Sequence, residues 1–218
     1  MIFGTPTIVT NGLILHLDAG NRMSYAGSGR VWRDLSGNGY DNSSTQALNT
    51  LPSYNTTSQG YFTFNGTSQY VSSSYNQPAY TSATSFTWNV WVNPATVATA
   101  APILGNRGGA ELVFTKLTPQ SFQYYSSTLN ANLATNVWQN VCVVKNGSSF
   151  TEYINGYSVG QFTNATSKVA TPFHIGGDPI AGEYFAGSIS NVQVYNRALT
   201  NQEVIQNYNA IKSRYGLI

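Results

Sequence analysis

The sequence predicts an all-β protein, in which two stacked antiparallel sheets carry a single α-helix at the C-terminal end. Short stretches of alternating apolar and polar residues recur about every 8–12 residues through the 218-residue chain. Asn-Gly pairs at residues 146–147 and 155–156 separate three of these stretches, and this dipeptide is the strongest short-range signal of a β-hairpin. The one strong helix signal lies near the C-terminal end, over residues 200–216.

Residues 1–11 are predicted to form a lead-in segment, and residues 12–218 a single domain, because no linker or change of composition divides them. The first strand is predicted at residues 12–18, where leucines alternate with other residues and share one face. His16 lies on the opposite face, and we expect it to be half-buried with a structural role. Residues 19–44 are rich in glycine and predict a long loop.

The clearest central strand is predicted at residues 86–93. Phe86 and Trp88 begin an apolar face, Thr87 and Asn89 begin the opposite face, and Pro94 removes the next ladder donor. Further strands are predicted at residues 61–64, 69–71, 102–105, 111–115, 121–125, 138–145, 150–154, 157–159 and 187–195, and residues 173–178 lead into the last of them.

The C-terminal helix is predicted to begin at Thr200, because Thr200 and Glu203 have the spacing of a capping box. Its apolar residues recur at helical spacing, and Gly216 is a natural left-handed stop. These apolar residues, Val204, Tyr208, Ile211 and Tyr215, form a stripe along one side of the helix. Because one short helix is not stable alone, we expect this stripe to pack against the rest of the chain.

The composition is unusually poor in charge, since only 8% of residues are Asp, Glu, Lys or Arg. A net charge of +2 without a Lys/Arg cluster predicts no nucleic-acid partner, and no apolar run is long enough for insertion in a membrane. No signal peptide is evident at residues 1–12. Cys142, the only cysteine, is expected to be a buried apolar residue, which argues for assembly in a reducing compartment.

Stretches at residues 32–39, 61–71, 137–156 and 187–204 resemble a known family. Residues 187–204 resemble the closing motif of laminin-G-like jelly rolls in the concanavalin A-like lectin/glucanase superfamily, and residues 32–39 resemble a loop of the same superfamily. The closing motif is matched by Val192, Val194, Tyr195, Asn196, Arg197, Ala198, Leu199, Thr200, Glu203 and Val204. The resemblance implies a jelly-roll sandwich over roughly residues 12–212.

The superfamily includes glucanases, which need two carboxylates facing each other across the bond they cleave. None of the chain's carboxylates forms the Glu-x-Asp-x-x-Glu strand motif of those enzymes, and only Asp178 and Glu183, which flank one loop, suggest a pair. We therefore predict from the sequence that the chain is not an enzyme. The eight carboxylates are Asp18, Asp34, Asp41, Glu111, Glu152, Asp178, Glu183 and Glu203.

The resemblance also implies a structural calcium ion, for which Asp18 and Asp41 are the candidate ligands. Ser190 stands where the family's closing strand carries an acid, and fewer carboxylates weaken a calcium site. The alternative is that Asp18 is simply a turn residue.

A sugar site combines an aromatic platform with polar groups, because a sugar has an apolar face and a rim of hydroxyls. Each candidate also has a structural alternative: Arg107 could pair with Asp178 or Glu111, and one ring of Tyr124 and Tyr125 could lie in the core. The candidates are Asn106, Arg107, Tyr124, Tyr125, Asp178, Glu183 and Tyr184.

Motifs within residues 12–39, together with residues 206–210 and 214–216, are similar to lectin-like domains in virion proteins of tailed bacteriophages. This resemblance implies a non-catalytic structural protein on the virion surface, as a capsid decoration or a tail-fibre component, assembled in the host bacterial cytoplasm. Its expected partners are other virion proteins, host cell-surface glycans and further copies of itself. A free carbohydrate-binding lectin and a glycan hydrolase are the alternatives.

Overall fold

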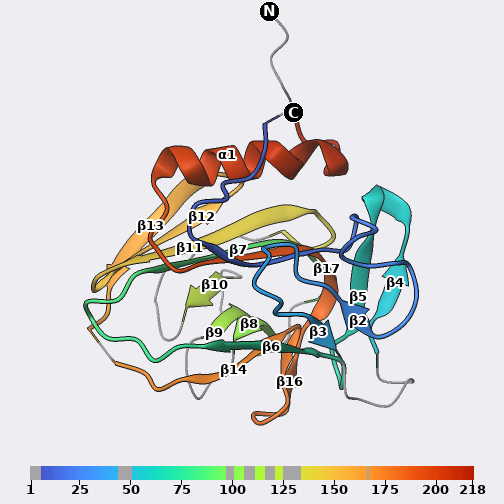
Figure 1. Ribbon diagram of the computed structural model, residues 1–218, viewed down its shortest axis with the longest axis horizontal. Helices are drawn as coiled ribbons and strands as arrows, with labels where there is room; N and C mark the ends of the chain where they lie inside the picture. The colour runs from blue at the N-terminus through green and yellow to red at the C-terminus, as the bar shows by residue number, and fades with distance from the viewer. Residues whose placement is uncertain are drawn as a thin grey trace, which may run out of the picture.

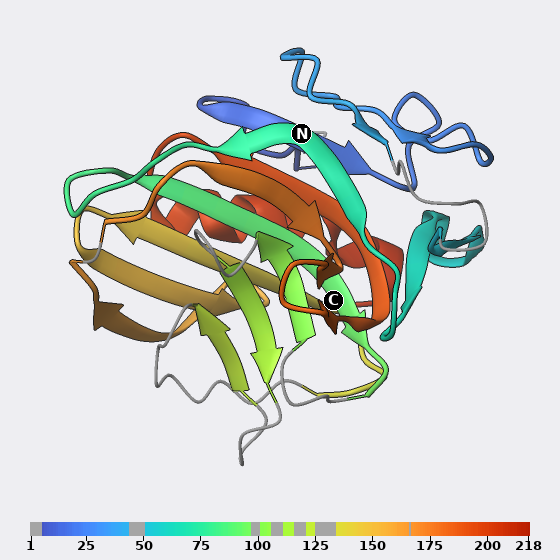
Figure 2. The same cartoon turned by 90° about the horizontal axis from the view of Figure 1, so that it is seen from below.

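The protein has three layers in the computed structural model: one helix, a large sheet and a smaller sheet (Figure 1). The predicted architecture is confirmed, because every pairing between neighbouring strands is antiparallel and the main helix is C-terminal. Seen from below, the strands lie in front of α1 (Figure 2). The structure describes residues 6–43, 51–96, 101–105, 111–115, 121–124, 134–165 and 167–218.

The larger sheet is organised around β17 (Ala186–Tyr195), the last strand in the sequence. One side of β17 pairs with β7 (Phe86–Pro94), while the other side pairs first with β5 (Tyr61–Asn65) and then with β1 (Leu13–Asp18). β17 therefore lies at the centre of the sheet, although it is the last strand in the sequence. The remaining strands are β4 (Ser53–Asn55) beyond β5, and beyond β7 in spatial order β11 (Gln139–Asn146), β12 (Ser149–Ile154) and β13 (Tyr157–Thr163).

The smaller sheet packs against the inner face of the larger one. In spatial order it contains β10 (Ser121–Tyr124), β9 (Glu111–Thr115), β8 (Ala101–Gly105), β14 (Thr171–Ile175), β6 (Val71–Gln77), β3 (Asn42–Ser43) and β2 (Val31–Trp32). A separate two-stranded hairpin follows β14 and consists of β15 (Gly177–Asp178) and β16 (Glu183–Tyr184). A short 3₁₀ turn, η2 (Thr57–Gln59), connects β4 to β5.

The alternation predicted for residues 86–93 is confirmed in β7. Phe86, Trp88, Val90 and Val92 lie in the core between the sheets. The opposite face carries buried polar groups instead: Asn89 Nδ2 donates to Gln193 Oε1 at 3.0 Å. The sheet therefore buries both of its faces, because the C-terminal helix covers the second one.

The helix α1 (Asn201–Ile211) begins with the predicted capping box, in which the side chains of Thr200 and Glu203 bond each other's backbone. It ends earlier than the sequence predicted, because the chain tightens into a 3₁₀ turn, η3 (Lys212–Tyr215), before left-handed Gly216. Val204 packs in a second apolar cluster with Cys142, which is buried as expected. No helix in the described part of the chain is long and apolar enough to cross a membrane.

The described part of the lead-in segment packs against α1 and β17. Gln206 Nε2 donates to Thr7 O at 2.8 Å, Val9 N donates to Asn207 Oδ1 at 2.8 Å, and Tyr195 Oη donates to Val9 O at 3.0 Å. Chain segments about 200 residues apart in sequence therefore fix each other beneath and beside the helix.

The end of the chain is held by one ion pair and a column of rings. Arg214 donates from Nη1 and Nη2 to the two oxygens of Asp18 at 2.6 and 2.7 Å. Tyr215 stacks between Trp91 and Trp138, with ring centroids at 4.7 and 4.4 Å, and its hydroxyl bonds Ser190 Oγ. We call residues 212–216 with these contacts the C-terminal lock.

Glu203 should give the protein an acid-sensitive part of its stability. Its carboxylate accepts from Arg197 at 2.6 and 2.9 Å, and this pairing, with help from Thr200, lowers its pKa from 4.5 to about 2. Because the pKa of Glu203 is lower in the folded than in the unfolded protein, its ionised carboxylate stabilises the fold at neutral pH. This stabilisation is lost as the carboxylate is protonated, when the pH falls from 4.5 through about 2.

The change Glu203→Gln keeps a side chain that can complete a capping box and removes the charge paired with Arg197, so it should cost about 0.5–1 kcal/mol at neutral pH, the upper part of the range for partly exposed ion pairs. It should also flatten the acid limb of the stability curve. Urea unfolding of both proteins across this pH range is the measurement, and parallel curves would contradict the assignment.

Candidate functional site

The hairpin of β15 and β16 brings together three of the residues predicted to bind sugar. Gly177 pairs with Tyr184, and Asp178 pairs with Glu183. Asp178 Oδ1 accepts from the backbone N–H groups of Ile180 and Ala181 at 2.9 and 3.2 Å, which fixes the turn. The two carboxylates predicted to flank one loop are therefore cross-strand neighbours beside an aromatic ring.

Two further rings complete the site. Tyr70 lies 6.4 Å from Tyr184 between centroids, with the planes inclined by 40°, and 5.4 Å from His174 in an edge-on arrangement. Tyr70 and Tyr184 are both partly exposed, whereas His174 is 7% exposed. Two inclined phenol rings of this kind offer an apolar surface with polar edges.

Gly177 allows the rings to come this close. A Cβ atom at this position would lie 2.8 Å from Tyr184 Cδ1 and 3.2 Å from Tyr70 Cβ. The preceding Gly176 has φ +78°, and a Cβ there would lie 2.3 Å from the Phe64 ring. The Gly-Gly pair therefore seats the hairpin directly on the sandwich and sets the spacing of the aromatic surface.

His174 contributes a buried polar atom to this region. It lies in β14 opposite Ser72 of β6, and its Nδ1 has no hydrogen-bond partner among the described residues. Burial lowers the pKa of His174, and the opposing effect of Asp178 is smaller. The imidazole is therefore neutral at neutral pH and offers one donor and one acceptor.

The sequence predicted only part of this group. Asn106, Arg107 and Tyr125 lie outside the described residues, and Tyr124 is described only as a backbone position at the end of β10. The hairpin β15–β16 lies against β8, the strand that precedes Asn106 in the chain. We did not predict Tyr70 or His174 as site residues.

A signal for Tyr70 was present in the sequence. It precedes Val71, which is buried in the core, so the alternation of a strand directs the Tyr70 ring away from the core. To place His174 beside Tyr70, one must know that β14 pairs with β6, and a single sequence does not give the order of strands in a sheet.

The two predicted calcium ligands do not fit a calcium site. Both oxygens of Asp18, which is 4% exposed, are held by the Arg214 guanidinium. Asp41 instead accepts from the Asp34 backbone at 2.9 Å and faces Arg33 at 3.8 Å. A cation at Asp18 would have to displace a guanidinium, and within the described ranges no three His, Cys, Asp or Glu side chains form a metal cluster.

The comparisons with known proteins give a family and a fold. The model of the concanavalin A-like lectin/glucanases superfamily matches residues 65–205. A sialidase from Trypanosoma rangeli, solved with 2,3-difluorosialic acid, matches with a TM-score of 0.66 and 18% identity over 94% of this chain and 34% of its own. This chain thus spans about a third of the length of the first structures it matches. No curated protein matches the sequence.

Two further domains of known structure are also similar. The binding domain of Paraclostridial Mosquitocidal Protein 1 matches with a TM-score of 0.66 and 14% identity, over 95% of this chain and 56% of its own. Domain 4 of AbnA, an extracellular arabinanase from Geobacillus stearothermophilus solved with arabinotriose, matches with a TM-score of 0.62 and 18% identity. That match covers 90% of this chain and 98% of the domain. At these identities the likeness is one of fold.

These comparisons contradict the prediction that the chain is not an enzyme. The similar structures are mainly sialidases, and one is a mutant with trans-sialidase activity. The prediction was based on the absence of one linear motif. Catalytic carboxylates can also be assembled from separate strands and loops, so a missing motif does not exclude an activity.

Proposed function

Because the chain belongs to the concanavalin A-like lectin/glucanase superfamily, we propose that it binds glycans on the surface formed by Tyr70, Glu183 and Tyr184, which buried His174 and Asp178 support. The observation that carries this proposal is the pair of partly exposed rings, Tyr70 and Tyr184, together with the partly exposed carboxylate of Glu183, which lies on the same hairpin as Tyr184. The rings would stack on the apolar face of a sugar, and Glu183 would accept hydrogen bonds from its hydroxyls, whereas Asp178 is 1% exposed and fixes the turn.

The rest of the composition supports an uncharged, polar ligand. Only 8% of residues are charged, while the chain contains 15 tyrosines. Neutral sugars are bound by stacking and hydrogen bonds and need no strong electrostatic field. The neutral His174 beside Tyr70 fits the same chemistry.

The change Tyr184→Ala is expected to weaken glycan binding at least about tenfold. The variant loses both the apolar area that the ring buries against the sugar and the stacking energy of about 0.5–1.5 kcal/mol, and a loss of about 1.4 kcal/mol corresponds to a factor of ten. A glycan array would identify the ligand, and calorimetry would give its affinity for both proteins. Tyr157→Ala is the matched control, since Tyr157 is 74% exposed at the far edge strand β13. Equal affinities for the two variants would contradict the proposed site.

Hydrolysis at the same surface is the second candidate function. Asp178, which is 1% exposed, and the partly exposed Glu183 occupy directly opposed positions, where Cβ atoms lie about 4.5–5.5 Å apart in an antiparallel pair, so Glu183 is the carboxylate that can reach a substrate. The test is release of reducing sugar from a glycan that the protein binds. Release that is abolished by Glu183→Gln while binding persists would assign the reaction, and absence of release would leave binding as the function.

We further propose that the protein acts on the surface of a tailed-phage virion, as a capsid decoration or a tail-fibre component that adheres to host glycans. The support is the resemblance of its first forty residues and its end to virion lectin-like domains, together with the uncharged surface. Copurification with particles at a fixed stoichiometry, followed by particle imaging, tests this placement. Absence of the chain from purified particles would favour a free lectin.

A further inference from the structure

The outer face of the larger sheet, which carries α1, is only partly covered by the helix layer. On β5, β17 and β7 the side chains of Thr63, Ser188 and Asn93 lie on this face, because the residues that alternate with them belong to the core. All three are partly exposed, whereas Ser190 and Trp91, on the same face beneath η3, are fully buried. A strip of the outer face therefore remains open to solvent beyond the helix layer.

This open strip carries a row of hydroxyl and amide groups. Ser53 of β4 is paired with Thr63, Thr63 with Ser188, and Ser188 with Asn93, so four neighbouring strands each place one short polar side chain in the row. Neighbouring strands lie about 4.8 Å apart, which makes the row about 14 Å long. Thr63 Oγ1 and Ser188 Oγ share a hydrogen bond of 3.1 Å, and Asn55 Nδ2 donates to Thr63 Oγ1 at 3.1 Å. The sheet and these bonds hold the polar groups in place before any ligand binds.

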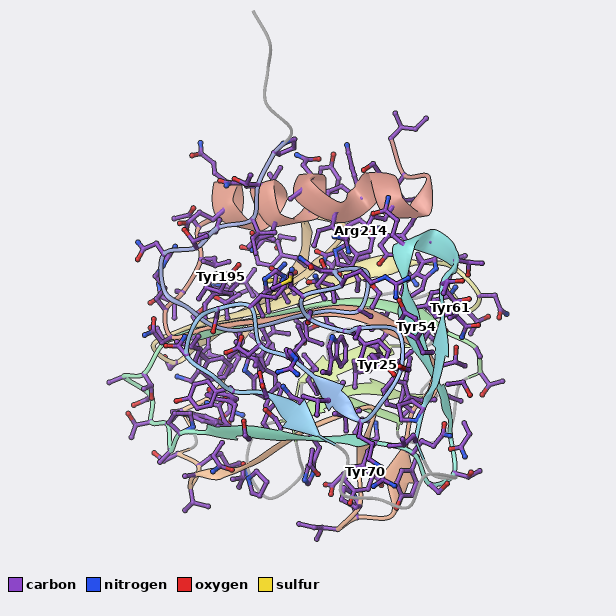
Figure 3. All side chains as sticks on the ribbon, turned by 45° about the vertical axis from the view of Figure 1, so that its right-hand side comes forward. Tyr25, Tyr54, Tyr61, Tyr70, Tyr195 and Arg214 are labelled. Atoms are coloured by element: carbon purple, nitrogen blue, oxygen red, sulfur yellow. The ribbon has the colours of Figure 1, made fainter. Side chains whose placement is uncertain are left out.

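Two aromatic rings stand beside the row. Tyr61 lies two positions before Thr63 on the same face of β5, and its ring centroid is 5.3 Å from that of Trp138, with the planes inclined by 68°. Both rings are partly exposed, and Trp138 also stacks on Tyr215 at 4.4 Å. Because β17 and β7 lie between β5 and β11, the two rings reach toward each other across the sheet. Figure 3 places Tyr61 on the β4–β5 side of the molecule, well away from Tyr70 at its base.

The open strip has no charge of its own. The strands β4, β5, β7 and β17 contain no Asp, Glu, Lys or Arg, and Arg214 of the neighbouring η3 is compensated by Asp18. A charged ligand would find no counter-charge here, whereas a neutral ligand rich in hydroxyls meets only hydroxyl, amide and aromatic groups. The centre of a protein–protein interface is more apolar than this row. The chemistry therefore favours a neutral sugar over an acidic glycan or a protein partner.

We infer that the open strip binds a linear neutral oligosaccharide. One sugar ring would lie against Tyr61 and Trp138, and hydroxyls of the following units would bond the row of Thr63, Ser188 and Asn93. The length of the row favours a chain of several sugar units over a monosaccharide. The open strip is separate from the hairpin β15–β16 and does not depend on glycan binding there.

The test is a fluorescence titration of the Tyr184→Ala variant, in which the hairpin surface is impaired, with cellohexaose, xylohexaose and maltohexaose. The chain has four tryptophans, and Trp32, Trp88 and Trp91 are 2% exposed or less, so Trp138 is the one that a ligand or acrylamide reaches most readily. We expect saturable binding of at least one hexasaccharide and protection of the fluorescence from acrylamide. The corresponding monosaccharide should bind about tenfold more weakly or worse, because it contacts fewer groups.

Two variants and a matched control locate the binding. Thr63→Val keeps a β-branched side chain and removes the hydroxyl, so the fold should be retained and the affinity should fall about threefold or more. Tyr61→Ala should lower the affinity about tenfold or more, with thermal unfolding as the check that it folds. Thr163→Val makes the same exchange at an exposed position of β13, at the far edge of the sheet, and should leave the affinity unchanged.

Four outcomes would each overturn the inference: no saturable binding of any hexasaccharide, binding without protection of the fluorescence, equal affinities for hexasaccharide and monosaccharide, or equal effects of Thr63→Val and Thr163→Val. Binding that is present in the unmodified protein and lost in Tyr184→Ala would also overturn it, because the hairpin surface would then be the binding site. Failure of the open strip and failure of the hairpin surface are thus distinguishable.

Discussion

Replacing Arg214 by alanine is expected to lower the free energy of unfolding by about 3–5 kcal/mol, the usual loss when one partner of a buried ion pair is removed. Asp18 is 4% exposed and both of its oxygens accept from Arg214, so the variant leaves a carboxylate buried without its counter-ion. Gly20 N would remain as a donor to Asp18 Oδ1 at 2.9 Å, which offsets only part of the loss. Denaturant unfolding at neutral pH is the measurement.

The control for this prediction is Arg22→Ala. Arg22 is exposed and donates one hydrogen bond to Ala26 O, so its loss should cost less than about 0.5 kcal/mol. The double variant Asp18→Asn with Arg214→Ala should recover part of the stability, because the uncompensated charge is gone. If the single and double variants were equally unstable, the ion pair would not be the cause.

Replacing Tyr215 by alanine is expected to lower the free energy of unfolding by about 2–4 kcal/mol, somewhat less than for a fully buried aromatic residue, because Tyr215 is half-buried. Its ring lies between Trp91 and Trp138, with planes inclined by 29° and 27°, so both indoles lose a stacked neighbour. The unfolding transition should move to lower denaturant concentration, and the intrinsic tryptophan fluorescence of the folded protein should change.

Tyr215→Phe separates the ring from its hydroxyl. This variant keeps both stacking contacts and loses only the hydrogen bond with Ser190, so it should cost about 1 kcal/mol. A loss as large as that of Tyr215→Ala would mean that the hydroxyl, and not the stacked ring, holds the C-terminal lock.

Features that depend on neighbouring residues could be predicted from the sequence. The two faces of β7 follow from strict alternation, and the start of α1 follows from Thr200 and Glu203 three positions apart. The pairing of Asp178 with Glu183 was also within reach, because both flank one short loop. Each of these signals is encoded within about ten residues.

Features that depend on the order of strands could not be predicted. Asp18 and Arg214 are 196 positions apart, and nothing local distinguishes Asp18 from a turn residue. Lys145 reads as an ordinary strand residue, yet it is fully buried, with Nζ donating to the carbonyls of Thr81 and Thr84 at 2.8 and 2.7 Å. Tyr70 and His174 meet only because β14 pairs with β6.

The position of β17 has a consequence for biosynthesis. The strand that joins β7 to β5 and β1 leaves the ribosome after every other strand of its sheet, so a nascent chain cannot complete the larger sheet until β17 has emerged. Until then β7 and β5 each have an unpaired edge, and such edges favour aggregation between growing chains. Productive folding of this domain should therefore wait for β17, and chains truncated before β17 should accumulate as insoluble material.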